Sequence, residues 1–279
     1  MSTEYLPANS SRLVSVFSDA VALTIAGSDP SGGAGLQADL KTFQQLGVYG
    51  MSVITLITVQ NTQTVHRVEV LSPELVLDQL DAVLEDIPPR SIKVGALGNA
   101  EVVQAVGNRL SKLKCPIVVD PVLVSKHGHS LAADDVVDAY KQYLLPHALL
   151  VTPNRFEAER LTGLRLNSED EVAEAVYILQ QLGAKHVLIK VGEIDGQSQH
   201  VLSLMDQNVA ILLPKLQTKH THGTGCILAA AITAKLARGE TDISAAVHFG
   251  IQRTYETLQF DTQLGKGLHP AEIRAMSRD

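Results

Sequence analysis

The sequence contains little of what marks several special classes of protein. It has no tryptophan and only 4% aromatic residues, so its core must be built from Val, Leu, Ile and Ala. Two cysteines, Cys115 and Cys226, cannot form a disulfide framework. The apolar run from Cys226 to Ala234 stops at Lys235, far short of the ~18 residues that a membrane span needs. These absences exclude a disulfide-stapled scaffold and a membrane span.

A basic excess and an N-terminal signal are missing too. The 279 residues include 23 Lys and Arg against 30 Asp and Glu, a net charge of −7, whereas nucleic-acid binding normally requires a basic stripe. Glu4 stands where a secretory signal places Lys or Arg, and no sustained apolar core follows it. We therefore predict no nucleic-acid partner, a polar lead-in over residues 1–19 and a cytoplasmic protein.

The sequence does contain an alternation of short β-branched runs with longer helical stretches. This alternation predicts an α/β fold with a mostly parallel central sheet, whose ligands bind beyond the carboxyl ends of the strands. No repeat or linker divides residues 20–279, which we expect to form a single domain. The predicted strands are Val21–Ala26, Ser52–Val59, Ile92–Val94, Ile117–Val119, Leu149–Val151, Val187–Lys190 and the hairpin of Gln199–Leu204 with Val209–Leu213 around a turn at residues 206–208. The predicted helices include ones that begin near Leu36, Pro73, Ser168, Gly223 and Ile243.

A glycine-rich loop, Gly27 to Gly35, follows the first predicted strand. Residues 33–38 satisfy the G-x-G-x-x-A pattern of dinucleotide-binding proteins, which also requires an acidic residue at the end of the second strand. That strand ends in TVQN (residues 58–61), without a carboxylate, and no G-x-x-x-x-G-K-[ST] phosphate loop occurs in the chain. A dehydrogenase is thus one alternative, and a tight turn with no ligand is another.

A second glycine-rich loop runs from Thr218 to Cys226 and precedes a very apolar helix. Glycines at a helix start let backbone N–H groups turn toward an anion, and the helix dipole favours negative charge there. The same field gives a thiol in the first turn, that of Cys226, thiolate character. The loop therefore indicates an anion site suited to phosphoryl transfer, the alternative being a flexible turn with a buried cysteine.

Two further loops offer polar side chains beyond predicted strands. Asn154 and Glu157 are three residues apart at a helix start, where their oxygens suit Mg²⁺. The same spacing suits a capping box, in which each side chain binds the other residue's backbone. Asp120, with Lys126 nearby, offers a carboxylate and an amine after the strand Ile117–Val119.

Two histidine pairs, His127/His129 and His220/His222, raise the question of a metal site. Their spacing is uninformative, and no cysteine pair accompanies them. We therefore predict no zinc site from these pairs.

Taken in order, these loops resemble those of one enzyme family. The segments AGSDPSGGAGLQADLKTF, VQNT, DPV-x-V-SK, TPN-x-x-EA and THGTGC are similar to those of the hydroxymethylpyrimidine/phosphomethylpyrimidine kinases of thiamine biosynthesis, in the ribokinase-like superfamily. The resemblance runs from about Leu23 to the segment GKGLHP (residues 265–270). It implies a ribokinase-like three-layer α/β/α sandwich, a homodimer, and ATP with Mg²⁺. It also implies two successive phosphorylations, of a pyrimidine alcohol and then of its monophosphate.

The resemblance implies a pyrimidine pocket made by four residues. Gln60 and Asp39 would bind the pyrimidine, and Ala34 and Thr58 would line its pocket. Gln60 is physically suited to this role, because an amide presents a donor and an acceptor together to an aminopyrimidine edge.

The resemblance likewise implies a nucleotide site. Lys190, Gly192 and Thr218 would bind ATP. Asn154 would contribute both to ATP binding and, with Glu157, to binding Mg²⁺, partly through water.

The catalytic centre implied by the resemblance is the helix start at residues 223–226. Gly223, Thr224, Gly225 and Cys226 would form the anion hole. If Cys226 is a thiolate, it can act as general base for the alcohol but is not needed for the anionic monophosphate. Replacing it by alanine would then slow only the first step, by roughly 10²–10⁴-fold.

A pyridoxal/pyridoxine kinase is the main alternative. That branch of the superfamily shares the cysteine at position 226, where most sugar kinases of the superfamily have Asp. It usually lacks the Gln60-Asn61 pair and carries a second cysteine at the position of Ser125, so the present residues favour the pyrimidine kinases. A binding regulator that lost turnover is the alternative from another class, and the retained site residues argue against it.

Three positions depart from the family pattern. Ala96 replaces the Met of K-x-G-M, which predicts a roomier or differently closed pocket. Glu193 ends a K-V-G-E segment where K-G-G-H is more usual, placing a carboxylate near the nucleotide. His269 stands where Gly is common.

Overall fold

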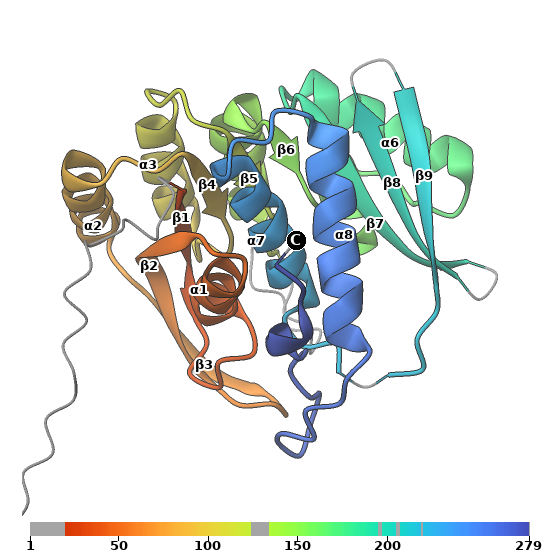
Figure 1. Cartoon of the computed structure of the whole chain (residues 1–279). Helices are drawn as coiled ribbons and strands as arrows, with labels where there is room; N and C mark the ends of the chain where they lie inside the picture. The colour runs from red at the N-terminus through yellow and green to blue at the C-terminus, as the bar shows by residue number, and fades with distance from the viewer. Residues whose placement is uncertain (1–19, 124–133, 195–196, 205–206, 219, 279) are drawn as a thin grey trace, which may run out of the picture.

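One nine-stranded sheet forms the centre of the protein (Figure 1). The computed structural model describes residues 20–123, 134–194, 197–204, 207–218 and 220–278, so the predicted lead-in (residues 1–19) and Ser125, Lys126, His127 and His129 lie outside the described residues. The strand order in space is β3-β2-β1-β4-β5-β6-β7-β8-β9. The strands are β1 (Val21–Ser28), β2 (Tyr49–Gln60), β3 (Val65–Val70), β4 (Ser91–Val94), β5 (Ile117–Val119), β6 (Leu150–Val151), β7 (His186–Ile194), β8 (Gln197–Leu204) and β9 (Gln207–Pro214).

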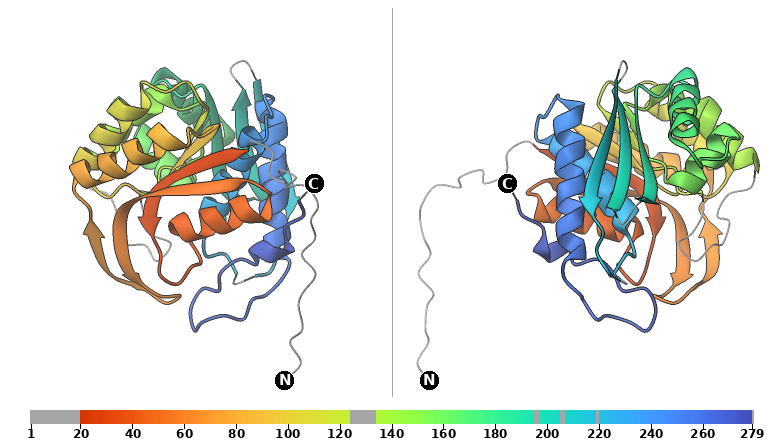
Figure 2. Two further views of the ribbon diagram at one scale, coloured as in Figure 1. Left: turned by 60° about the vertical axis from the view of Figure 1, so that its left-hand side comes forward. Right: turned by 90° about the vertical axis from the view of Figure 1, so that its right-hand side faces the viewer.

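Helices cover both faces of this sheet (Figure 2). On one face lie α1, α7 and α8, and on the other lie α2 to α6. Neighbouring strands from β2 across to β7 run parallel, which confirms the predicted three-layer sandwich with a mostly parallel sheet. The helices are α1 (Gly35–Gln45), α2 (Pro73–Asp86), α3 (Ala100–Leu110), α4 (Asp134–Ala139), α5 (Arg155–Thr162), α6 (Glu169–Gln181), α7 (Thr224–Ala237) and α8 (Ile243–Leu258), with short turns η1 (Tyr140–Leu144), η2 (Leu145–His147) and η3 (Ile273–Ala275).

The central strands are buried on both sides. All residues of β4 and β5 are buried, as are the six inner residues of β1. A parallel sheet covered on both faces requires continuous aliphatic runs, which is why these strands could be predicted from the sequence. Strands β2, β1, β4 and β5 run parallel, so their carboxyl ends lie at the same edge of the sheet.

Helix α7 is apolar almost all around its axis because it lies between the sheet and its neighbours α1 and α8. Its alanines allow close approach to the strands, and the Ser91 hydroxyl on β4 donates to the backbone oxygen of Thr233 at 2.8 Å. The helix start, which carries the second glycine-rich loop, is therefore held over the centre of the sheet.

The edges of the sheet are antiparallel. The hairpin of β8 and β9 was predicted, although Gln207 and Asn208 already belong to β9 rather than to the turn. Strand β3, which pairs antiparallel with β2, was not predicted, because VHRVEV is half-exposed or exposed throughout and has no buried face to set its period. Among the described residues, none of the helices has the length and apolar character of a membrane span.

Candidate active site

A cavity of about 1400 Å³ opens at the carboxyl ends of β1, β4, β5, β6 and β7. Its position is the one expected for a ligand site in a parallel α/β sheet. Twelve of the thirteen site residues named from the sequence line it together. These are Ala34, Thr58, Gln60, Asn154, Glu157, Lys190, Gly192, Thr218, Gly223, Thr224, Gly225 and Cys226.

The two glycine-rich loops pack directly on one another at the start of α7. Gly223 precedes the helix with a φ of 82°, and a side-chain carbon there would lie 1.8 Å from the backbone oxygen of Gly33. No side chain caps the helix among the described residues. The Thr224 N–H donates to the Thr221 oxygen at 3.5 Å, whereas the N–H groups of Gly225 and Cys226 remain available to an anion in the cavity.

Asp39, the remaining predicted site residue, does not line the cavity. It is fully buried, and its Oδ2 accepts hydrogen bonds from Thr24 Oγ1 (2.6 Å) and Lys93 Nζ (2.7 Å). Lys93 does line the cavity, and although burial disfavours its charge, the carboxylate of Asp39 raises its pKa. Asp39 therefore positions a cation, in place of the direct contact with a pyrimidine that the sequence led us to expect. The periodicity of helix α1 predicts that Asp39 faces inward, but it cannot show that the carboxylate meets Lys93, which lies on a strand 54 residues further along the chain.

A second lysine reaches the cavity from β7. Lys190 Nζ donates to Asp120 Oδ1 at 2.9 Å, and Thr152 Oγ1 donates to the same oxygen at 3.0 Å. Burial disfavours charge on Lys190, but Asp120 and then Glu157 raise its pKa. The amine beside Asp120 thus comes from Lys190, which the sequence assigned only to ATP; Lys126, the amine expected there, lies outside the described residues.

Cys226 lies in the first turn of α7, as predicted, but its thiol is not acidic. Burial raises the pKa of Cys226 to about 11, although the charge of Lys93 acts in the opposite direction. The expected thiolate character is therefore wrong for the unliganded protein. The prediction considered only the helix field, whereas the cost of desolvating a charged sulfur is larger here.

Asn154 and Glu157 form the capping box that the sequence offered as an alternative to a metal site. Asn154 Oδ1 accepts from the Glu157 N–H at 3.0 Å, and Glu157 Oε2 accepts from the Asn154 N–H at 2.8 Å. Burial, together with the charge of Asp120, raises the pKa of Glu157 to about 7, against the opposing effect of Lys190. The box leaves carboxylate lone pairs unused, so capping and a role in the cavity are compatible.

One wall of the cavity is formed by alternate residues of β2. The terminal amide of Gln60 lies 3.2 Å from Thr58 Oγ1 and 3.4 Å from the Nε2 of His222. These two neighbours contact both ends of an amide that lines the cavity. Ala96, two residues after β4, lines the same cavity.

Asp29 and His222 are cavity residues to which the sequence gave no role. Asp29 Oδ1 accepts from the N–H and hydroxyl of Ser31, and Oδ2 accepts from the Ala34 N–H (2.9 Å) and lies 3.0 Å from His222 Nε2. Burial opposes ionisation of Asp29, but His222 and then Ser31 lower its pKa to about 2. Since histidine is often a core residue, only the contact with Asp29 and Gln60 shows that His222 orders this wall.

Gly192, on β7, and Thr218, in the segment between β9 and α7, both line the cavity. Gly192 has a φ of 109° at an irregularity in the pairing of β7 with β8, which bends the strand directly after Lys190. Thr218 Oγ1 accepts from the His220 N–H at 3.0 Å, as in a tight turn.

The comparisons with known proteins agree with this geometry. A sequence profile described as "Phosphomethylpyrimidine kinase" matches residues 29–272. The hydroxymethylpyrimidine/phosphomethylpyrimidine kinase of Bacillus subtilis (strain 168) is 42% identical over 262 residues, which are 92% of this chain and 96% of the relative. The structure of a phosphomethylpyrimidine kinase from Clostridium difficile 630 is 40% identical, with a TM-score of 0.75 over 85% of this chain and 98% of that one.

A solved structure from another branch is also similar. The pyridoxal kinase from Staphylococcus aureus in complex with ADP is 36% identical, with a TM-score of 0.84 over 91% of this chain and 93% of that one. All these similar proteins are kinases, which removes the dehydrogenase alternative. The chain belongs to the phosphomethylpyrimidine kinase family.

Proposed function

We propose that this protein transfers the γ-phosphoryl group of ATP to 4-amino-5-hydroxymethyl-2-methylpyrimidine and then to its monophosphate, yielding the pyrophosphate for thiamine biosynthesis. One observation carries the proposal: an amide suited to an aminopyrimidine, that of Gln60, shares a cavity with an uncapped helix start and two lysines. The acceptor and the transferred phosphoryl group would meet between them.

The donor side of the cavity supplies charge stabilisation. Phosphoryl transfer spreads negative charge over the phosphoryl oxygens, so catalysis depends on positioning and on preorganised positive groups. The N–H groups at Gly225 and Cys226, Lys93 and Lys190 are such groups. Thr218, Gly192 and Asn154 would position the nucleotide, in line with the ADP held by the similar pyridoxal kinase.

The oxygen ligands in the cavity also fit Mg²⁺. Glu157 and Asp120 are both buried carboxylates, and the charge of Asp120 raises the pKa of Glu157. A hard cation with oxygen ligands would offset this repulsion between negative charges. Asn154 and Glu157 would hold the ion, partly through water. When bound, Mg²⁺ would neutralise charge on the nucleotide phosphates, while Lys190 stays paired with Asp120 and keeps that carboxylate oriented.

A substrate panel tests the proposal. The chain is assayed for ADP release with ATP and Mg²⁺ on hydroxymethylpyrimidine, its monophosphate, pyridoxal and pyridoxine. We expect turnover of both pyrimidines. Turnover of the pyridoxal group alone would contradict the proposal, and no ADP release with any acceptor would indicate a binding regulator.

A pyridoxal kinase is the second candidate, favoured by Ala96 and by the similarity to the S. aureus enzyme. The smaller side chain leaves room for a bulkier ring. Ala96→Met restores the usual family residue and sharpens the test: if it removes pyridoxal turnover and retains pyrimidine turnover, position 96 sets the breadth of the pocket.

We further propose a homodimer, and the cytoplasmic location stays a prediction. Ile57 and Val59 alternate with the cavity residues of β2 and are 48% and 45% exposed on its outer face. A second copy would cover this apolar face. Ile57→Glu should reduce the mass measured by sedimentation to that of one chain, and an unchanged mass would contradict this placement of the interface.

A further inference from the structure

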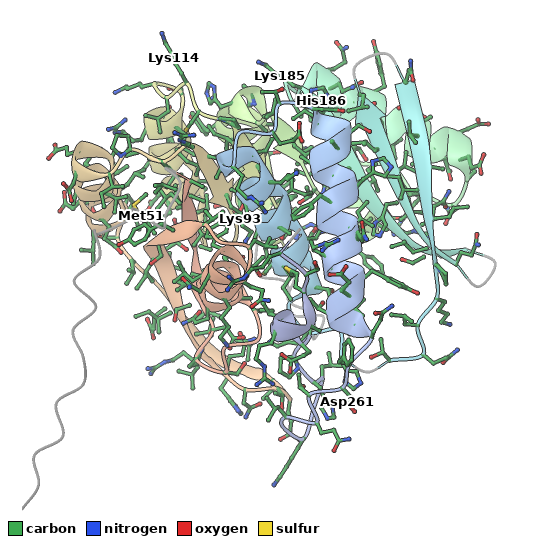
Figure 3. All side chains as sticks on the ribbon, in the orientation of Figure 1. Met51, Lys93, Lys114, Lys185, His186 and Asp261 are labelled. Carbon is green, nitrogen blue, oxygen red and sulfur yellow. The ribbon has the colours of Figure 1, made fainter. Side chains whose placement is uncertain are left out.

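We propose that His220, Asp261 and His269 form a site for one divalent transition-metal ion, best suited to Zn²⁺, outside the catalytic cavity. One ligand atom from each side chain lies within 4.8 Å of the other two. None of the three residues lines the cavity. Figure 3 shows Asp261 at the lower edge of the molecule, below α8, apart from Lys93 in the interior.

Both imidazole nitrogens approach the same carboxylate oxygen. His220 Nδ1 and His269 Nδ1 lie 2.8 and 2.9 Å from the same oxygen, Asp261 Oδ1. The imidazole rings are stacked, with centroids 5.3 Å apart and planes 18° from parallel. Donors of a tetrahedral zinc site lie roughly 3.4 Å apart, given metal–donor distances of about 2.1 Å. A small outward movement of the rings therefore admits an ion.

His220 provides a second, independent indication of a ligand. Its Nδ1 is a buried atom without a hydrogen bond among the described residues, although Asp261 Oδ1 lies 2.8 Å away. A buried polar nitrogen without a hydrogen bond is costly. Coordination of a metal by Nδ1 would satisfy it.

The site is held in place by the backbone around it. The His222 N–H donates to the His269 oxygen, and the Ala271 N–H donates to the His222 oxygen, both at 3.3 Å. Asp261 and Ala271 form an antiparallel bridge. The ligands are thus preorganised, and the side chains of His220 and His269 are only 12% and 21% exposed.

The donor set discriminates between ions. Two imidazole nitrogens and one carboxylate oxygen suit Zn²⁺, Co²⁺ or Ni²⁺, with the remaining positions taken by water. Mg²⁺ prefers oxygen ligands, so the site would not compete for the ion of the nucleotide. The sequence argued against zinc through the His220/His222 pair, but the structure separates that pair: His222 contacts Asp29, whereas His220 meets residues 41 and 49 positions further on.

Metal binding at this site would link two loops. His220 lies between Thr218, on the cavity rim, and α7, whereas Asp261 and His269 belong to the segment after α8. A bound ion would fix the loop that presents Thr218 against this segment. It would stabilise the folded chain by an amount that rises with the logarithm of the ion concentration above the Kd.

Metal binding to the full chain without an affinity tag tests the proposal. After removal of metals by a chelator, Zn²⁺ is measured by equilibrium dialysis, and Co²⁺ by its visible d–d absorption. We expect one ion per chain. His269→Gly should weaken binding on the order of 100-fold or more, above the 10–100-fold typical of losing an outer partner of a metal ligand. Asp261→Asn should have a similar effect.

His248→Ala is the matched control, since His248 is an exposed histidine on α8 outside the cluster. It should bind Zn²⁺ as the parent chain does. Thermal unfolding without metal checks that the variants fold, and Zn²⁺ should raise the unfolding temperature of the parent and of His248→Ala only. Absence of stoichiometric binding, or equal binding by His269→Gly, would overturn the proposal.

Discussion

The two ends of the cavity are built differently. At the end that we propose binds the phosphates, Lys93 and Asp39 are fully buried, Lys190 is paired with Asp120, and the start of α7 is held between the sheet and two helices. At the acceptor end, Gln60 and Thr58 are half-buried on β2, beside the exposed strand β3. Buried charges tolerate little rearrangement, whereas side chains at the edge of a hairpin can change without disturbing the core. Under the proposed function, the core would set the transfer chemistry, and a few residues at the edge of the sheet would set the choice of acceptor.

Removing the cation at the phosphate end should have the largest effect. We expect Lys190→Met to lower kcat/KM for both acceptors by about 10²–10³-fold, the usual cost of losing one preorganised group that stabilises charge in the transition state. Lys185→Met, an exposed lysine before the same strand, is the control.

Stability must be separated from catalysis in that experiment, because Lys190→Met leaves the buried carboxylate of Asp120 without its nearest cation. Adding Asp120→Asn should restore thermal stability without restoring activity. If the double variant recovers both, Lys190 acts only by stabilising the fold.

The acceptor end is tested by Gln60→Ala. The loss of one polar partner should lower catalytic efficiency for the pyrimidine by about 5–150-fold, or roughly 1–3 kcal/mol, with little change in the KM for ATP. Gln63→Ala, an exposed glutamine in the following loop, is the control for steady-state kinetics. An unchanged catalytic efficiency for the pyrimidine would contradict both the proposed pocket and the proposed difference between the two ends of the cavity.

The wall between the two ends is tested by His222→Ala. The low pKa of Asp29, about 2 against an ordinary 3.8, contributes stability that is present above pH 3.8 and is lost as the pH falls through 2. Without His222 this contribution should shrink by about 1 kcal/mol. Urea unfolding at about pH 5 should show the deficit of the variant, which should diminish toward pH 2. A deficit independent of pH would mean that Asp29 is not involved.

The smallest expected effect concerns Cys226. Because its thiol is protonated at neutral pH, Cys226→Ser should slow both phosphorylations by less than about fivefold, against the roughly 10²–10⁴-fold that loss of a general base costs. Single-turnover rates on the alcohol and on the monophosphate measure this. A large loss confined to the alcohol would restore the general-base hypothesis.

The raised pKa of Cys226 predicts how stability and thiol reactivity depend on pH. Its pKa of about 11 lies above the ordinary 9.0, so its contribution to the free energy of unfolding is fully present below pH 9 and is lost as the pH rises through 11. In Cys115→Ser, Cys226 is the only thiol. Its alkylation rate in that variant should still be rising at pH 10, and a plateau near pH 8 would contradict the structural account.

Features that depend on local pattern were predictable from the sequence. Aliphatic runs predicted β4 and β5 because a strand buried on both faces allows no other composition. The loops after the strands could be recognised as one site because parallel strands end at one edge of a sheet. The cap at Ser168 and the helix start at Gly223 follow from local hydrogen bonding and backbone conformation.

Only the tertiary structure decided which distant segments pair and how burial changes the ionisation of their side chains. Asp39 was known as a carboxylate on a helix, but its partner Lys93 is set by the packing of α1 on the sheet. The thiol of Cys226 has the position that the sequence predicts and the opposite ionisation, because desolvation depends on everything packed around a group and not on its neighbours in the chain. For the same reason, His220 and His222 contact different parts of the molecule although they are two residues apart: His220 lies beside Asp261, and His222 lies beside Asp29. Which side chains meet depends on the packing of the folded chain, and the spacing of residues in the sequence does not contain that information.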